Sequence, residues 1–185
     1  MKKHELRKRI LTARAALTND YTQSAGLKIE NIVINSELFR NAKSVFIYVS
    51  MQCEPSTFLL LEEAWNSGKE VYVPKCYPNN EMKAVKVNGW IDLAPGLMGI
   101  LEPVNDTKTI NVSMIDLAVI PCVSASKTGA RLGHGAGYYD KFLHGAKVKK
   151  ICLCFEQLLS EEIPMTEHDI RMDYVITEND NNFIS

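Results

Sequence analysis

The chain changes character at Ser44-Val45-Phe46-Ile47-Tyr48-Val49-Ser50, a β-branched and aromatic run that predicts a buried strand. A proline-led turn at 55–57 then introduces residues 58–67, whose leucines and tryptophan predict an amphipathic helix ending at Gly68. A second short apolar run, at 71–74, predicts another strand. Because a strand, a helix and a strand follow one another, we expect a parallel unit with a right-handed crossover.

The segments on either side extend this pattern. Residues 3–39 carry apolar side chains at three- and four-residue steps, with a break and a new N-cap at 18–20, which predicts two helices; Leu27 is among the apolar residues of the second. Later runs predict strands at 82–87, 115–121, 150–155 and 173–177, a helix at 138–144, a loop-rich stretch at 88–109 and a loosely held tail at 178–185. Residues 1–185 are therefore expected to form a single α/β domain with a mainly parallel central sheet flanked by helices.

Composition excludes several classes of protein. Twenty-one basic and 22 acidic residues give a formal net charge of −1, without the basic excess of a nucleic-acid-binding chain. The N-terminus is charged, and no apolar stretch approaches the ~20 residues of a membrane helix. The five cysteines include no CxxC pair, and Cys152 and Cys154 are most simply explained as buried thiols. We therefore expect a cytoplasmic protein that binds neither nucleic acid nor membrane.

A glycine-rich stretch carries most of the chemical information: Arg131-Leu132-Gly133-His134-Gly135-Ala136-Gly137-Tyr138-Tyr139-Asp140. Alternate glycines let backbone N–H groups approach an anion, and the predicted helix that follows points its positive dipole end at the same place. Arg131 adds a cation suited to phosphate oxygens, and Asp140 offers a carboxylate to Mg²⁺. The spacing matches neither the Walker A loop nor the GxGxxG fingerprint. From the glycines alone, a tight strand-to-helix turn without a ligand stays open, and an aspartate in the position of Asp140 is, taken alone, more often a first-turn helix acid than a metal ligand.

The same stretch resembles the signature of the 5-formyltetrahydrofolate cyclo-ligase family. Accessory motifs extend the resemblance over nearly the whole chain: Lys3-x-x-Leu6-Arg7, Tyr48-Val49-Ser50 with Glu54-x-x-Thr57, Pro74-Lys75, Gly99-Ile100-Leu101-Glu102-Pro103 and His168-Asp169-x-x-x-Asp173. The chain departs from the family pattern at Pro55, at Cys122 and at 124–126. These departures concern the fine geometry of the substrate site rather than the phosphate loop.

The resemblance implies an ATP- and Mg²⁺-dependent ligase that forms a cyclic C–N bond. Such an enzyme converts 5-formyltetrahydrofolate, with or without a polyglutamate tail, to 5,10-methenyltetrahydrofolate and releases ADP and phosphate. The implied mechanism places the γ-phosphoryl group of ATP on the formyl oxygen before N10 attacks. The resemblance also implies a fold like that of ribose-5-phosphate isomerase and the CoA transferases, and a monomer or weak homodimer.

The resemblance further implies a three-part site. ATP would be bound by Lys3 and Arg7, which share a helix face, and by Arg131, Leu132, Gly133, His134, Gly135, Ala136, Gly137, Tyr138 and Tyr139. Val49 and Glu54 would bind the folate, with Glu54 and Arg131 as the catalytic residues, and Asp140 and Asp173 would hold Mg²⁺. Taken one by one, these residues also have simpler explanations: a solvated basic face, core packing, or an acid at a strand edge.

Two other functions stay open on the residues themselves. One is a non-catalytic nucleotide- or folate-binding module on the same scaffold. The other is an α/β enzyme acting on a phosphorylated metabolite, such as a sugar-phosphate isomerase, which would not need ATP.

Overall fold

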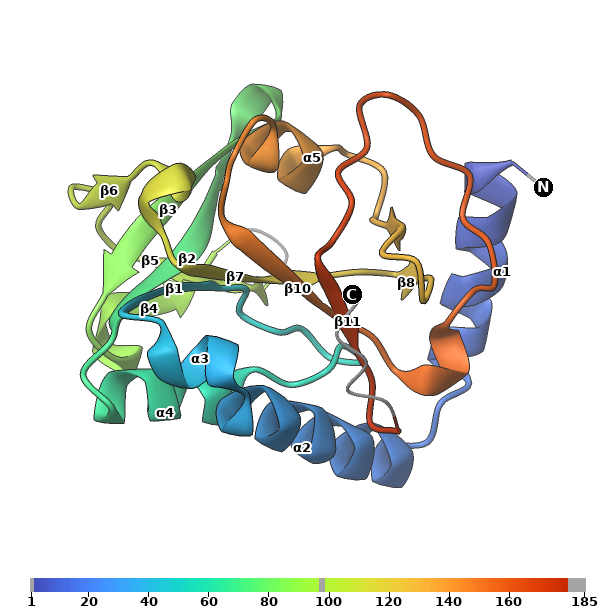
Figure 1. The fold of residues 1–185 in the computed structure, drawn as a ribbon, viewed down its shortest axis with the longest axis horizontal. Coiled ribbons are helices and arrows are strands. Elements are labelled where there is room, and N and C mark those ends of the chain that lie inside the picture. Colours follow the sequence, from blue (N-terminus) through green and yellow to red (C-terminus); the bar gives the residue numbers. More distant parts are fainter. Residues whose placement is uncertain (1, 97–98, 180–185) are drawn as a thin grey trace.

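A seven-stranded sheet in the order β11-β10-β7-β1-β2-β3-β6 forms the centre of the computed structural model, which describes residues 2–96 and 99–179 (Figure 1). Five of its strands run parallel: β1 (Ser44–Ile47), β2 (Glu70–Tyr77), β7 (Leu117–Pro121), β10 (Lys149–Leu153) and β11 (Tyr174–Ile176). Two antiparallel strands, β3 (Glu81–Val87) and β6 (Thr109–Ile110), extend the sheet at one edge. The predicted α/β fold with a mainly parallel sheet is confirmed.

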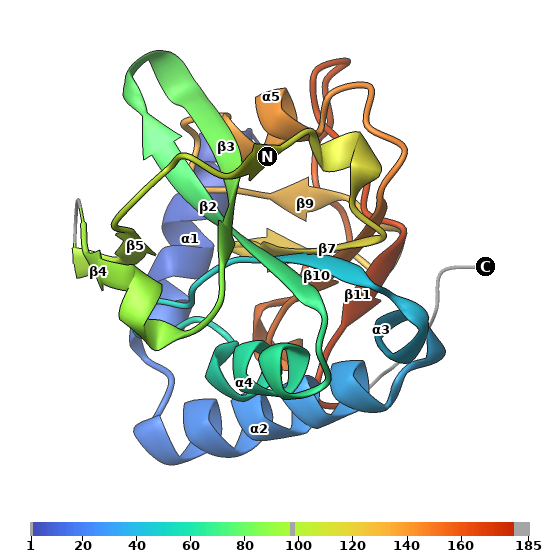
Figure 2. The same ribbon diagram turned by 90° about the vertical axis from the view of Figure 1, so that its left-hand side faces the viewer.

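Helices cover both faces of this sheet. They are α1 (Lys3–Ala15), α2 (Asn19–Asn35), α3 (Glu37–Asn41), α4 (Phe58–Asn66) and α5 (Tyr138–Leu143), with short 3₁₀ turns η1 (Pro78–Asn80), η2 (Trp90–Asp92), η4 (Val112–Met114) and η5 (Glu156–Leu158). Figures 1 and 2 show α2, α3 and α4 below the sheet and α5 above it, while α1 stands at one side of the molecule. The helices therefore leave the region between α1 and α5, above the sheet, for the loops that follow the strands.

The N-terminal helices begin and end where local capping dictates. Thr18 Oγ1 accepts the N–H of Tyr21, which confirms the break expected at 18–20. The second predicted helix is divided at Ser36, because its Oγ accepts the N–H of Phe39 and so starts α3. Of the apolar residues on the second predicted helix, Leu27 is 53% exposed, whereas Ile29 and Val33 are buried and face the core.

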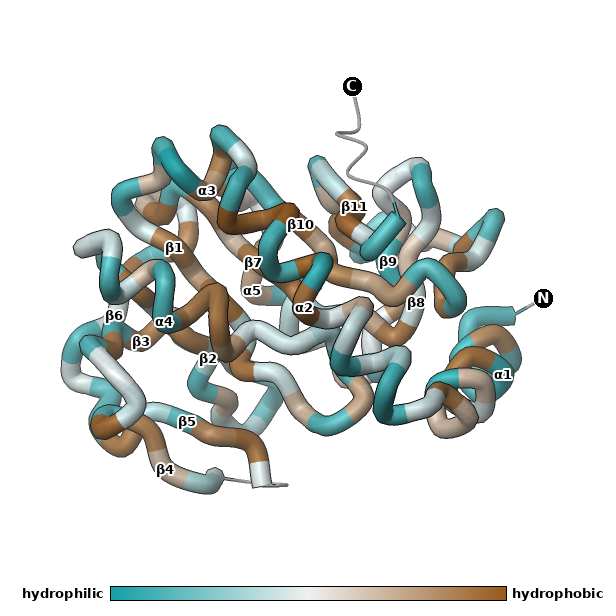
Figure 3. The backbone as a smooth tube through the Cα atoms, turned by 90° about the horizontal axis from the view of Figure 1, so that it is seen from below, coloured by the Kyte–Doolittle hydropathy of each residue, from teal (hydrophilic) through white to brown (hydrophobic). Residues whose placement is uncertain are grey.

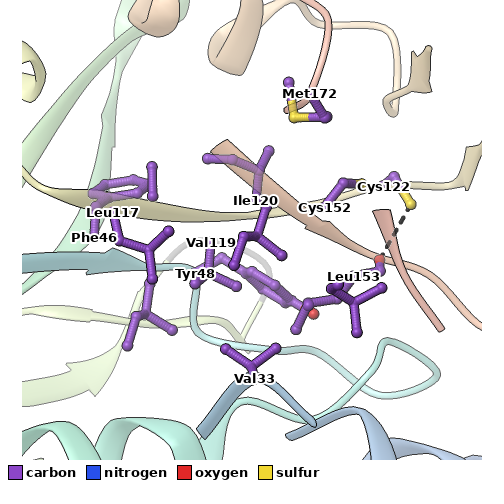
Figure 4. Close-up of a cluster of buried hydrophobic side chains, with 14 of the residues drawn as sticks. Val33, Phe46, Tyr48, Leu117, Val119, Ile120, Cys122, Cys152, Leu153 and Met172 are labelled. Carbon is purple, nitrogen blue, oxygen red and sulfur yellow. Dashed lines mark hydrogen bonds between the residues drawn. The ribbon is translucent and has the colours of Figure 1, made fainter. Parts of the chain in front are cut away.

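The core lies on the strands of the parallel sheet. Phe46, Leu117, Ile120 and Leu153 are fully buried and pack as shown in Figure 4, and Figure 3 shows apolar residues along β1 and β10. Three cysteines, Cys122, Cys152 and Cys154, are also buried, so the expectation of buried thiols at the last two is confirmed.

Short strands appear where the sequence predicted loops. β4 (Leu93–Pro95) pairs with β5 (Leu101–Pro103), and β8 (Ser124–Ala125) pairs with β9 (Arg131–Leu132). The second pair inserts a small hairpin between β7 and α5, where we expected a direct strand-to-helix turn. Of the tail expected to be loosely held, residues 180–185 lie outside the described part of the chain.

Within residues 2–96 and 99–179, none of the helices combines the length and the apolar character needed to cross a bilayer.

Candidate functional site

A cavity of about 950 Å³ opens beyond the carboxyl ends of the parallel strands. Its wall includes Tyr48 and Val49, which follow β1, Pro121 at the end of β7, and Pro74 and Cys76 in the second half of β2. The chain leaves β1 to form β2 on one side and returns as β7 on the other. The cavity therefore lies at the point where the strand order reverses, which is where open α/β sheets bind ligands.

The glycine-rich loop forms one wall of this cavity. Gly135 (φ +106°) and Gly137 (φ +76°) have left-handed backbone conformations that disfavour other residues. A Cβ on Gly135 would lie 3.3 Å from Cζ of Arg7, and one on Gly133 would lie 3.0 Å from Nη1 of Arg131. Arg7 Nε also donates to the carbonyl of Gly133 at 2.8 Å. The glycines thus allow the loop to bend, and the absence of a Cβ lets Arg7 and Arg131 pack closely against it.

Arg131 lines the cavity, but its guanidinium is embedded in the wall. The residue is 6% exposed, and its Nη2 donates to Asp140 Oδ2 at 2.9 Å while its Nη1 donates to the carbonyl of Pro121 at 3.2 Å. Its Cζ lies 5.4 Å from the ring centroid of Tyr139. The sequence predicted a cation suited to phosphate oxygens. In the structure both Nη groups already have protein acceptors, so Arg131 also anchors the loop to β7 and α5.

Lys3 and Arg7, four residues apart on α1, both line the cavity. The Nζ of Lys3 donates to Asp169 Oδ2. Burial acts to raise the pKa of Asp169, but hydrogen bonds from Lys3 and Thr166 outweigh it and hold that pKa below its ordinary value. Lys141, a further basic residue of the wall, adds to the positive charge on this side of the cavity.

Glu54 lies on the cavity wall next to the glycine-rich loop. It is 8% exposed, and its Oε2 accepts the N–H of Met51 at 3.0 Å. Its Oε1 lies 3.4 Å from Nη2 of Arg14 and 3.7 Å from Nε2 of His134. Val49, 4% exposed, lines the same cavity. The structure therefore brings the predicted folate residues and the predicted ATP residues to one space.

The two predicted metal ligands do not come together. Asp140 lines the cavity, and its Oδ1 accepts the N–H of Ile170 at 3.1 Å. Asp173 precedes β11, at the amino ends of the strands, where its Oδ2 accepts the N–H of Lys150 at 2.7 Å and lies 3.0 Å from Lys150 Nζ. It is not part of the cavity wall; it ties the start of β10 to that of β11.

Asp169 is the carboxylate that stands in the place expected for Asp173. It lines the cavity, and it directly precedes the residue whose N–H Asp140 accepts. It belongs to the His168-Asp169 motif of the sequence, which by itself indicated no role for it. Within the described part of the chain, His, Cys, Asp and Glu nowhere form a group of three that could hold a metal ion, so a cation here would need ligands from a bound molecule or water.

A mainly parallel sheet with a charged, glycine-lined cavity at its switch point is typical of open α/β proteins that bind a ligand at the carboxyl edge of the sheet. The chain belongs to the 5-formyltetrahydrofolate cyclo-ligase family, whose model matches residues 1–178. The recognition made from the motifs is therefore confirmed, as is the expectation of an enzyme.

Relatives and solved structures resemble the chain over nearly its full length. It is 32% identical to the 5-formyltetrahydrofolate cyclo-ligase of Saccharomyces cerevisiae, covering 94% of each chain. It is 30% identical to a probable 5-formyltetrahydrofolate cyclo-ligase of Caenorhabditis elegans, covering 96% of this chain and 93% of that one. The NMR structure of Aquifex aeolicus 5,10-methenyltetrahydrofolate synthetase superposes with a TM-score of 0.88 at 29% identity, covering 100% of this chain and 93% of that one. The fold and the family are thus supported independently.

Proposed function

We propose that the protein uses ATP and Mg²⁺ to convert 5-formyltetrahydrofolate to 5,10-methenyltetrahydrofolate, with release of ADP and phosphate. One observation carries the proposal: the glycine-rich loop with its basic neighbours and the buried acid Glu54 face the same cavity, with His134 Nε2 only 3.7 Å from Glu54 Oε1. A reaction between a triphosphate and a formyl group needs both held in one place, and holding them there removes much of the entropic barrier.

The chemical difficulty is that a formamide oxygen is a very poor leaving group. In the proposed reaction the formyl oxygen attacks the γ-phosphorus of ATP, and the bond from that phosphorus to the ADP oxygen breaks. N10 then attacks the activated formyl carbon and loses its proton, and the C–O bond breaks to release phosphate. The protein contributes mainly positioning and charge neutralisation, as in other phosphoryl transfers.

The phosphates of ATP are proposed to lie against the loop at 131–139. Its backbone N–H groups are accessible because alternate positions lack side chains, and residues 134–137 are exposed to the cavity. Lys3 and Arg7 reach the same wall from α1 and neutralise phosphate charge. Arg131 keeps the loop in place through Asp140 and the Pro121 carbonyl, so its contribution combines charge with support of the loop.

Asp140 and Asp169 fit a magnesium ion better than the pair first predicted. Both line the cavity, and Asp140 already accepts the N–H of Ile170, the residue that follows Asp169. Two carboxylates, completed by phosphate oxygens and water, suit the octahedral oxygen coordination of Mg²⁺. When bound, the ion would neutralise negative charge on the phosphates. Asp173 is left with a structural role at the start of β11.

The folate is proposed to occupy the part of the cavity around Val49 and Glu54. Apolar side chains of Met51, Met82 and Ile100 line the same cavity and offer a surface for the pterin ring. The Glu54 carboxylate would accept hydrogen bonds from N–H donors of the reduced pterin or near N10. This places the formyl group between the acid and the phosphate loop.

A direct assay tests the proposal. Purified protein is mixed with ATP, Mg²⁺ and 5-formyltetrahydrofolate, and the methenyl chromophore is followed in the near ultraviolet, with ATP or Mg²⁺ omitted in turn. We expect the chromophore only in the complete mixture. Folate and ATP binding without turnover would instead support a binding module, and turnover of a phosphorylated metabolite without ATP would support an isomerase-like enzyme.

A further inference from the structure

A buried arginine lies behind the proposed folate acid. Arg14, in the last turn of α1, is 6% exposed and continues the buried stripe of Leu6 and Ile10 at four-residue steps. Its Nη2 lies 3.4 Å from Glu54 Oε1, and its Nε donates to the carbonyl of Cys53. Unlike Glu54, Arg14 does not belong to the cavity wall. Any effect it has on a ligand must therefore pass through the residues it holds.

The segment held by Arg14 adopts an unusual backbone conformation. Cys53 has a φ of +65°, which L side chains rarely adopt outside tight turns. The N–H of Glu54 donates to the carbonyl of Met51, and the N–H of Met51 donates to Glu54 Oε2. Arg14 binds both the carbonyl of Cys53 and the carboxylate that follows it, so it fixes the direction in which Glu54 faces the cavity.

The same helix also reaches the phosphate side of the cavity. Arg7, two turns before Arg14, donates to the carbonyl of Gly133, and Lys3 donates to Asp169. Helix α1 thus contacts the glycine-rich loop, the proposed metal region and the proposed folate acid through three basic side chains. A rigid helix that touches all three sets their relative positions.

Stability alone does not explain an arginine at this place. A buried ion pair often contributes no more to stability than well-packed apolar residues of similar volume, because both charges must be desolvated. An apolar residue would complete the stripe of Leu6 and Ile10 without that cost.

We infer that Arg14 is a positioning residue for substrate recognition: it orients Glu54 toward the N–H donors of the folate. This inference rests on the proposed function, since it assigns a task to the residue behind the proposed folate acid. It predicts that Arg14 affects the use of 5-formyltetrahydrofolate, that it does so through Glu54, and that it leaves the use of ATP nearly unchanged.

A double-mutant cycle tests the inference. Arg14→Gln, Glu54→Gln and the double variant are compared with the wild type in steady-state assays of methenyl formation, with folate and ATP varied separately. We expect Arg14→Gln to lower kcat/KM for the folate about tenfold, which corresponds to about 1.4 kcal/mol, and to change the KM for ATP less than about twofold. Because residues that act as one unit are not additive, adding Arg14→Gln to Glu54→Gln should cost almost nothing more.

Controls separate positioning from folding. Arg9→Gln removes an exposed arginine of the same helix and should behave as the wild type. Arg14→Met fills the stripe with an apolar side chain of similar length; if Arg14→Gln unfolds, the cycle is run with Arg14→Met, for which the same folate-specific loss is expected. Arg14→Lys, which keeps the charge but loses the forked geometry, should recover part of the activity.

Several results would overturn the inference: full additivity of the two substitutions, equal losses for ATP and folate, or wild-type folate kinetics in a folded Arg14→Met protein. All of them presuppose an active wild type. A wild type that forms no methenyl product in the presence of ATP would instead overturn the proposed function, and this inference with it.

Discussion

The substitution Gly135→Ala should impair the proposed binding of the ATP phosphates more than it destabilises the fold. The backbone at this position has a φ of +106°, and the new Cβ would lie 3.3 Å from Cζ of Arg7 and 3.4 Å from its Nη1. The left-handed conformation costs an L residue about 1–2 kcal/mol. In a chain of this size, that corresponds to a fall in Tm of roughly 2–8 °C. The side chain of Arg7 must also move, which weakens or breaks its hydrogen bond to the Gly133 carbonyl.

The loss in nucleotide use should be larger than this loss of stability suggests. A hydrogen bond to a charged group contributes about 1.5–3 kcal/mol, so a displaced Arg7 would raise the KM for ATP roughly ten- to hundredfold. Gly68→Ala is the matched control, because Gly68 has a φ of +73° at the end of α4 and a Cβ there would meet nothing within 4 Å. Both variants are compared by thermal unfolding and by steady-state kinetics. The reasoning would be refuted if Gly135→Ala lost stability like the control but kept the wild-type KM for ATP.

Three further predictions concern the acids. Glu54→Gln should impair folate use and spare ATP binding, as measured by separate calorimetric titrations; loss of ATP binding with folate binding intact would reverse the division of the site. Asp140→Asn should raise the Mg²⁺ concentration needed for half-maximal activity, whereas Asp173→Asn should lower only the urea midpoint, because Asp173 joins β10 to β11; the opposite pattern would restore Asp173 as a metal ligand. Asp116 has a lowered pKa because it accepts backbone N–H bonds, chiefly from Ser44. Its contribution to stability is therefore present above its unfolded pKa and lost as the pH falls through its folded pKa. Asp116→Asn should thus destabilise the protein at about pH 7, and the loss should shrink progressively as the pH is lowered below 3.8; a loss that stays constant through the acid range would contradict this.

The sheet could be predicted from the sequence because buried parallel strands are short, continuous apolar runs. β1 and β7 lie within such runs, β10 begins two residues before the apolar run at 151–155, and Gly68 marks the turn after α4. The hairpin of β8 and β9 could not be predicted, because two-residue strands have no alternation to detect. Leu27 fits a helical apolar stripe but lies on the solvent side, since the register of a helix against its neighbours is a tertiary property.

The site was predictable in its residue types and less so in its contacts. The motif at 131–140 indicated a loop with a cation and a carboxylate. The two Nη groups of Arg131 donate to Asp140 and to the Pro121 carbonyl, and these contacts depend on how the loop packs, which the sequence does not show. Asp169 and Asp173 lie in one motif, and only the placement of β11 decides which of them faces the cavity. The role of Arg14 could have been suspected from the sequence, because it continues the buried stripe of Leu6 and Ile10. A buried arginine is rare unless it is paired with a buried anion.

The central claim is that the triphosphate lies on the backbone of residues 133–137. A crystal structure with a non-hydrolysable ATP analogue and Mg²⁺ tests it most directly. We expect phosphate oxygens within hydrogen-bonding distance of the N–H groups of this loop, with Lys3 and Arg7 alongside. An occupied nucleotide whose phosphates lie elsewhere, with the loop in contact only with solvent, would contradict the claim.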